Sequence, residues 1–374
     1  MPQPSGSEFR ERPMTERALV LCDGYFGTNT GKTANGLVRF SRRYKIVGVV
    51  DRANAGRDAG EVLDGRPNGI PIVASLEEGI ERCRPDALIV GVATFGGYIP
   101  NEFRPVIRAA IQRGLGVVAG LHEYLSHDPE FHALAAERGV ALVDVRRPRA
   151  LRELRQFSDL ARKLPCLRLA VLGTDGSIGK RTTAILLTEA LNAAGINAAF
   201  VATGQTGLLQ GADFGVPVDA IPGDFVVGEL EWEIHRAYEA TKPEVIVVEG
   251  QGSISHPAYV MGTRAILMAA MPQSIVLQHA PARKTRNFRR DVVAWPMPRL
   301  EDEIHMLELF SPGKVVAIAL NHEGMTREQV DVTAKEYESR YRLPTCDPLW
   351  HGVDKLVAAV RIQLGKQERG ASPS

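Results

Sequence analysis

The chain has 374 residues, more than one hydrophobic core usually organises, so two domains are expected. Lysine and arginine number 45 against 44 aspartates and glutamates, a balance that argues against a broad nucleic-acid-binding surface. The four cysteines form no CxxC pair, so neither a disulfide framework nor a thiolate zinc site is expected, and a cytoplasmic location is the simplest interpretation. No apolar run approaches the ~20 residues that span a bilayer, and we expect no membrane partner.

The first half of the chain alternates short apolar runs with segments of helical spacing. Residues 1–15 are polar, rich in Pro and Ser, and predict a disordered leader. Strands are predicted at 18–22, 45–51, 86–92, 116–120 and 140–145, with helical stretches between them. Continuous apolar strands that alternate with helices indicate a parallel sheet covered on both faces. Residues 16–150 therefore predict a Rossmann-like domain.

A second alternating pattern follows the basic segment 146–166, whose spacing predicts a connecting helix closed by Pro165. Strands are predicted at 167–173, 197–204, 244–250, 273–279 and 314–321, and helices at 180–195, 226–241, 301–310, 326–341 and 353–365. Residues 151–366 predict a P-loop domain, and 367–374 a disordered tail. The predicted fold class is α/β, with two doubly wound parallel-sheet domains, Rossmann-like followed by P-loop NTPase-like.

The clearest chemical signal is a phosphate-binding loop in the sequence LRLAVLGTDGSIGKRTTAILL, which begins at Leu167. An apolar strand runs into a glycine-rich turn, then a lysine and a helix. Glycines let backbone N–H groups turn toward phosphate oxygens, while the lysine and the helix N-terminus add positive charge. The residues predicted to bind the cofactor are Thr174, Asp175, Gly176, Ser177, Gly179, Lys180, Arg181, Thr182 and Thr183.

This loop departs from the usual P-loop spacing. Five residues separate Gly173 from Gly179, and Arg181 stands where Ser or Thr usually follows the lysine. The variant resembles the loop of dethiobiotin synthetase. If ATP and Mg²⁺ are the ligands, Thr182 and Glu249 are the candidate metal ligands. Otherwise no metal site is predicted.

Two candidate catalytic residues lie in the sequence VIVVEGQGSISHP, which begins at Val245. Glu249 ends a predicted strand, where parallel sheets place their ligands, and could take a proton from a substrate amine. His256 is the alternative base. Each could instead serve only to shape a turn.

Substrate-binding candidates come from three further segments. Gln205 and Thr206 lie in a short polar stretch, 202–207, that we expect to be a flexible loop. Asp224 lies in an acidic segment, 218–233, that suits a metal ion or a substrate ammonium group. For Glu229 and Glu231 in that segment, a solvated helix face is an equal alternative. Arg283 and Arg286 belong to a local basic run that could grip carboxylates or phosphates. Those residues could equally belong to a solvated loop.

Several motifs together resemble one family, formerly described as a domain of unknown function and now including D-glutamate N-acetyltransferases. The motifs are GYFGTNTGKTANGLVR, GLHEYL, GTDGSIGKRTTA, ATGQTG, IPGDFVVGELE and VEGQGSISHPA. The resemblance covers about residues 17 to 365. It implies a Rossmann-like domain, a P-loop domain, and acetyl transfer from acetyl-CoA to the amine of D-glutamate.

The leading hypothesis is an acyl-CoA-dependent N-acyltransferase that acts on a small acidic amino acid, with acetyl-CoA as donor, and that forms a homo-oligomer. Lys180 and the loop backbone would bind phosphate, and Glu249 or His256 would deprotonate the amine. The main alternative is an ATP- and Mg²⁺-dependent kinase or ligase. A nucleotide sensor is a third possibility, and a sensor would not require the carboxylate at the strand end.

Overall fold

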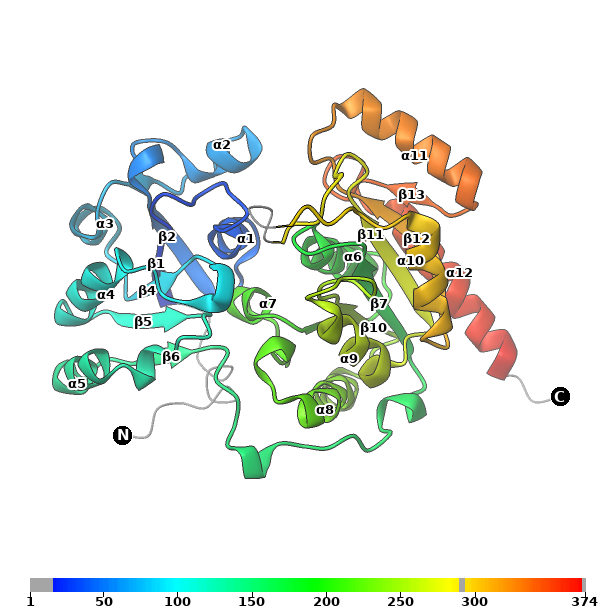
Figure 1. Ribbon diagram of the computed structural model, residues 1–374, viewed down its shortest axis with the longest axis horizontal. Coiled ribbons are helices and arrows are strands. Elements are labelled where there is room, and N and C mark those ends of the chain that lie inside the picture. Colours follow the sequence, from blue (N-terminus) through cyan, green and yellow to red (C-terminus); the bar gives the residue numbers. More distant parts are fainter. Residues whose placement is uncertain (1–15, 289–292, 372–374) are drawn as a thin grey trace. The chain divides into compact units, whose positions relative to one another are not determined.

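The computed structural model describes residues 16–288 and 293–371, which form two compact units (Figure 1). The first unit comprises the residues up to Glu153 together with Gln205–Ala212, and the second comprises Leu154–Gly204 and the residues from Asp213 onward. The predicted leader at 1–15 lies outside the described residues. Among the helices that are described, none is long and apolar enough to cross a membrane.

The first unit is a parallel six-stranded sheet in the order β3-β2-β1-β4-β5-β6. This is the strand order of Rossmann folds, and it confirms the predicted fold. The strands are β1 (Glu16–Leu21), β2 (Tyr44–Val50), β3 (Ile72–Val73), β4 (Ala87–Val90), β5 (Gly116–Ala119) and β6 (Leu142–Asp144). The helices are α1 (Lys32–Phe40), α2 (Ala59–Asp64), α3 (Leu76–Cys83), α4 (Phe103–Gln112), α5 (Pro129–Arg138) and α7 (Gln205–Gln210).

The second unit is a parallel seven-stranded sheet in the order β13-β12-β11-β7-β10-β8-β9. The parallel sheet confirms the predicted fold class, and two of its strands, β9 and β13, were not predicted. Its strands are β7 (Leu167–Gly173), β8 (Ala198–Ala202), β9 (Phe214–Gly215), β10 (Val245–Glu249), β11 (Ser274–His279), β12 (Lys314–Leu320) and β13 (Thr345–Cys346). Its helices are α6 (Lys180–Ala193), α8 (Gly223–Thr241), α9 (Val260–Ala270), α10 (Leu300–Leu309), α11 (Arg327–Tyr341) and α12 (Asp354–Ala371).

Helices cover both faces of the second sheet, which is why its strands read as continuous apolar runs. On one face, α8 and α9 bury Leu230, Ile234 and Ile266. On the other, α6 and α12 bury Leu187 and Leu356 among others. The sheet is therefore a rigid platform, with the carboxyl end of β7 at its centre, between β10 and β11.

The prediction of a connecting helix at 146–166 is wrong. The segment holds only two short 3₁₀ turns, Leu151–Glu153 and Ala161–Lys163. Its backbone N–H groups donate instead to carboxylates of α8: Arg155 to Glu229, and Ser158, Leu160 and Ala161 to Glu231. Side-chain acceptors thus replace the helical ladder, and Pro148 and Pro165 cannot donate to one.

The predicted flexible loop at 202–207 is also corrected, because α7 begins at Gln205 and all six of its residues are buried. The apolar pair Leu208 and Leu209 follows the polar stretch and gives this short helix a buried side. The predicted disordered tail overlaps α12, which extends to Ala371 because the residues after 365 are mostly good helix formers. Residues 372–374 lie outside the described part of the chain.

Candidate functional site

The predicted phosphate loop occupies residues 174–179, between β7 and the first residue of α6. Gly179 has a φ of 103°, which an L side chain rarely adopts, and it brings the chain into the helix. No side chain caps α6, and its first turn holds no acidic residue. The helix therefore presents its positive N-terminal end to the loop without a carboxylate of its own first turn to offset it.

Five consecutive carbonyl groups of the loop accept hydrogen bonds from side chains that surround it. Arg286 donates to Thr174 O (3.2 Å), Lys180 Nζ to Asp175 O (2.5 Å), Arg283 to Gly176 O (2.8 Å) and Ser177 O (3.2 Å), and Asn321 Nδ2 to Ile178 O (2.9 Å). In a trans peptide the N–H of the next residue points opposite to the carbonyl. The N–H groups of residues 175–179 therefore face away from these donors, and none has an acceptor among the described residues. A run of N–H groups without a protein acceptor is the arrangement that an anion-binding nest requires, and residues 175–179 are called the nest below.

Lys180 is buried and joins this loop to the turn after β10. Its Nζ donates to Gly252 O at 2.9 Å as well as to Asp175 O. Gly250 makes the approach possible, because a Cβ there would lie 2.1 Å from Val171 O and 2.9 Å from the lysine Cδ. The close passage of the lysine thus explains Gly250, whereas Gly252 has a φ of 54° and a Cβ there would lie 1.8 Å from Tyr259 O.

Glu249 is buried at the carboxyl end of β10, beside the loop strand β7. Its Oε2 accepts the N–H groups of Thr203 (2.9 Å) and Gly204 (3.2 Å), while no described residue donates to Oε1. Burial raises the pKa of this carboxyl, and the nearby positive charges of Arg181 and Lys180 act in the opposite direction. A carboxyl with one uncommitted oxygen and a raised pKa suits proton transfer.

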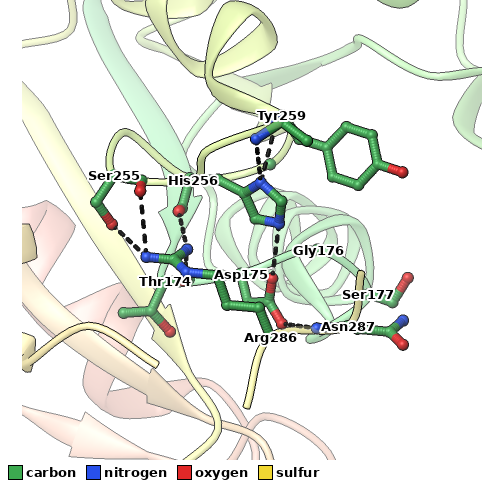
Figure 2. A network of polar contacts seen from close by, with 12 residues as sticks. Thr174, Asp175, Gly176, Ser177, Ser255, His256, Tyr259, Arg286 and Asn287 are labelled. Carbon is green, nitrogen blue, oxygen red and sulfur yellow. Dashed lines mark hydrogen bonds and ion pairs between the residues drawn. The ribbon is translucent and has the colours of Figure 1, made fainter. Parts of the chain in front are cut away.

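His256 lies beneath Tyr259, and its ring orientation is fixed by the backbone (Figure 2). Nδ1 accepts the N–H groups of Ala258 (3.0 Å) and Tyr259 (2.9 Å), so the proton of the neutral ring is on Nε2, 3.5 Å from Oδ1 of Asp175. Burial lowers the pKa of this histidine to about 4. The ring is a donor, and its one acceptor nitrogen is occupied, which does not favour a role as base.

The two predicted substrate-binding arginines are buried and directed at the phosphate loop. Arg283 also donates to Asp175 Oδ2 (2.8 Å) and pairs with Glu323. Arg286 also donates to Ser253 Oγ (2.8 Å) and Ser255 Oγ (2.7 Å). These contacts turn both guanidinium groups toward the loop's own carbonyls, so the structure supports a role in shaping the loop and gives no indication of substrate contact.

The other predicted cofactor residues stay with the loop. Thr183 is buried and donates to Gln278 Oε1 at 2.5 Å, whereas Arg181 and Thr182 are partly exposed in the first turn of α6. Within the described residues, no three His, Cys, Asp or Glu side chains gather as a metal site would require.

Three predicted substrate residues have other surroundings within their own units. Asp224 is exposed in the first turn of α8. Gln205 and Thr206 belong to the first unit, where Arg146 donates to the amide oxygen of Gln205 (2.9 Å) and Thr33 shares a hydrogen bond with Thr206 (3.0 Å).

Sequence reasoning missed several residues that hold the loop. Gln278 was detectable as a polar side chain inside an apolar strand. Ser253 and Ser255 stood in a recognised motif without an assigned role. Glu303, which accepts hydrogen bonds from Ile254 and Ser255, had no local signal, because it is the last of three consecutive acidic residues at the start of α10.

Comparisons with known proteins agree with this architecture. The model described as "Domain of unknown function (DUF1611_C) P-loop domain" matches residues 155–357, and the "DUF1611_N Rossmann-like domain" matches residues 52–148. A protein of Tritonibacter scottomollicae named D-glutamate N-acetyltransferase is 33% identical over 73% of this chain and 80% of its own length. A protein of the same name from Pseudoalteromonas sp. is 30% identical over 72% of this chain and 80% of its own length.

A solved structure gives the same result. The crystal structure of a DUF1611 family protein from Anabaena variabilis ATCC 29413 superposes with a TM-score of 0.85 at 32% identity, and covers 93% of this chain and 99% of that one. The paired domain matches, the similar relatives and the shared fold together show that this chain belongs to the DUF1611 family.

Proposed function

We propose that this chain is an N-acetyltransferase that acetylates the amine of D-glutamate, or of a similar small acidic amino acid, with acetyl-CoA as donor. The names of the two relatives support the reaction. The observation that carries the proposal in the structure is the run of inward N–H groups at residues 175–179, because coenzyme A brings a pyrophosphate and a 3′-phosphate that need such donors.

The phosphates would be held by the backbone N–H groups of residues 175–179 and by the N-terminal end of α6, while the charge of Lys180, whose Nζ donates to Asp175 O, would act through the loop. The hydrogen bonds that the loop carbonyls already accept support this role, because they leave the N–H groups available to an anion. When bound, acetyl-CoA supplies an acetyl group activated as a thioester. Every other requirement of the reaction falls to the protein.

The protein must first remove a proton from the substrate, because an ammonium nitrogen has no lone pair with which to form a bond. Glu249 is our proposed base. Its Oε1 would take the proton, so that an N–H bond breaks and an O–H bond forms on the carboxyl. Because burial raises its pKa, the protonated product of this step is stabilised relative to an exposed carboxyl. His256 is the weaker candidate, since Nδ1 is already engaged.

The experiment is a ligand comparison followed by an assay. Melting temperatures are measured with coenzyme A, acetyl-CoA and ATP with Mg²⁺, and thiol release is then followed with D-glutamate and L-glutamate. We expect stabilisation by both coenzyme A species and thiol release that depends on D-glutamate. A ligand at ~100 times its dissociation constant stabilises by about 2.7 kcal/mol, which a melting experiment detects.

Two outcomes would contradict the proposal. Stabilisation by ATP with Mg²⁺ alone, lost in both Thr182→Ala and Glu249→Gln, would favour the kinase or ligase alternative. Binding of coenzyme A without turnover of any acidic amino acid would support the anion site but contradict the proposed substrate.

A further inference from the structure

A buried polar chain runs from α10 to the phosphate loop, and Figure 2 shows three of its residues, Ser255, Arg286 and Thr174. It begins at Glu303, which is fully buried. The carboxylate accepts the Ile254 N–H at 3.0 Å and the hydroxyl of Ser255. The Ser255 Oγ in turn accepts from Arg286 at 2.7 Å, and Arg286 donates to Thr174 O. Three side chains therefore connect a helix without any assigned role to the first carbonyl of the nest.

The proton positions in this chain are fixed by the chemistry of its members. A serine hydroxyl has one hydrogen, and here it is donated to Glu303. The lone pairs of Ser255 therefore face Arg286, which can only donate. Turning the serine hydrogen toward Arg286 would place two donors against each other and leave the carboxylate without this donor, so the arginine and the carboxylate together fix the direction of the chain.

The charges in this chain also balance across it. Burial raises the pKa of Glu303, and the positive charge of Arg286 opposes that rise. Burial likewise lowers the pKa of Arg286, and Glu303 opposes that fall. Each charge offsets part of the desolvation cost of burying the other, and the Ser255 hydroxyl lies between them.

We infer that Glu303 is a positioning residue for the anion site, acting through Ser255 and Arg286 on the peptide that joins Thr174 to Asp175. The inference rests on the proposed anion site and extends it to a residue more than one hundred positions away in the sequence. Glu303 touches no ligand. It fixes the arginine that turns Thr174 O outward, and so the direction of the Asp175 N–H.

The test replaces Glu303 by Gln, which keeps the shape but not the charge. The amide oxygen can still accept from Ile254, but the amide NH₂ then faces the serine oxygen and competes with Arg286. We expect the affinity for inorganic pyrophosphate, measured by calorimetry, to fall by about tenfold, the loss typical of one charge-assisted hydrogen bond. Hydrogen exchange of the 253–259 turn should rise in the ligand-free protein.

A double-mutant cycle and a matched control make the result specific. Ser255→Ala interrupts the same chain, so the double variant should lose little more affinity than either single one. Glu301→Gln removes a carboxylate from the same helix that pairs outward with Arg340 and Tyr341, and it should leave pyrophosphate affinity unchanged. If Glu303→Gln does not fold, Ser255→Ala carries the test, because it leaves the carboxylate paired with Ile254.

The outcomes separate this inference from the proposed function. If the wild type binds pyrophosphate and Glu303→Gln binds it equally well, Glu303 only supports the turn and the inference is overturned. Additive losses in the double variant would overturn it as well. If the wild type itself binds neither pyrophosphate nor coenzyme A, the proposed anion site falls, and the inference with it.

Discussion

The ammonium of Lys180 makes two contributions to the proposed anion site, and a single substitution removes both. It adds a positive charge beside the nest, and it also ties Asp175 O to Gly252 O. We predict that Lys180→Met, which keeps the chain length, weakens coenzyme A binding at least tenfold while the KM for the amino-acid substrate changes little. The control is Lys242→Met, which removes an exposed lysine paired with Glu239 at the end of α8. Equal losses in both variants would contradict a specific role for Lys180.

Glu249 illustrates the conflict between activity and stability at a buried site. A raised pKa means that the fold binds this proton more tightly than the unfolded chain does. The stability that protonation contributes is therefore fully present below the ordinary value of 4.5 and is lost as pH rises through the raised pKa. We predict that Glu249→Gln, which does not titrate, gains stability relative to the wild type between pH 4 and pH 7, while turnover falls ~10²–10⁴-fold.

Urea unfolding of both proteins at several pH values measures this difference, with Glu244→Gln as control. Glu244 immediately precedes the same strand and is exposed. A stability difference that stays constant with pH would show that burial does not raise the pKa of Glu249. Full turnover in Glu249→Gln would show that Glu249 is not the base.

The sequence was sufficient to locate single residues only where their role is local. The strand, the glycines and Lys180 follow one another in the chain, so the loop could be recognised from their order. The role of Arg283 and Arg286 could not, because a basic run in the sequence does not say whether the guanidinium groups face a ligand or the loop's own carbonyls. The tautomer of His256 was equally hidden, since it depends on backbone N–H groups placed by a turn.

At the scale of elements, α8 acts as an anchor for the strap of chain at 154–164. Glu231 accepts three backbone N–H groups of that strap, from Ser158 (2.8 Å), Leu160 (2.7 Å) and Ala161 (3.4 Å). We predict that Glu231→Ala lowers the free energy of unfolding by about 2 kcal/mol, because these groups lose their acceptor. Pyrophosphate affinity should be unchanged, which distinguishes this carboxylate from Glu303.

The control for Glu231 is Glu239→Ala, on an exposed turn of the same helix. Chemical denaturation of the two variants gives the comparison. A loss in Glu239→Ala as large as that in Glu231→Ala would attribute the effect to helix propensity, and not to the strap.

The long apolar strands and amphipathic helices were predictable because their patterns repeat over several residues. The two-residue strands β3, β9 and β13 were not, since a pattern of that length carries no period. The strap was mistaken for a helix because its spacing is helical, while the acceptors that compete for its N–H groups belong to another element. α7 was predicted to be a loop because its first residues are polar and glycine-rich, and the leucines that give it a buried side come only at its end.

For the whole molecule, the two α/β units were predictable because the alternation of apolar strands and helices is interrupted at 146–166 and then resumes. The boundary between the units is nevertheless not a single point in the sequence. α7 follows β8 of the second unit and yet is part of the first. Gln210 donates to Gly36 O at 2.7 Å and accepts the Arg42 N–H at 2.7 Å, and Gln205 and Thr206 make the contacts described above. A sequence read in order assigns this helix to the wrong unit, because the assignment depends on contacts far away in the chain.

This exchange leads to a prediction about dissection of the protein. A chain that begins at Leu154 carries residues 205–212 without the unit to which they belong. The six buried residues of α7 would then be exposed, among them Leu208 and Leu209. We predict that such a chain binds a hydrophobic dye and unfolds with low cooperativity, because apolar surface exposed in a folded protein favours association. Replacing 205–212 by a Gly-Ser linker of equal length should restore a sharp transition, together with pyrophosphate binding, since the nest and its surrounding side chains all lie in the second unit.

If the shortened chain unfolds sharply without that replacement, exposure of α7 does not reduce the cooperativity of unfolding, and the prediction is wrong. If the linker restores folding but not pyrophosphate binding, the anion site depends on the first unit as well, and the nest at residues 175–179 is not sufficient by itself.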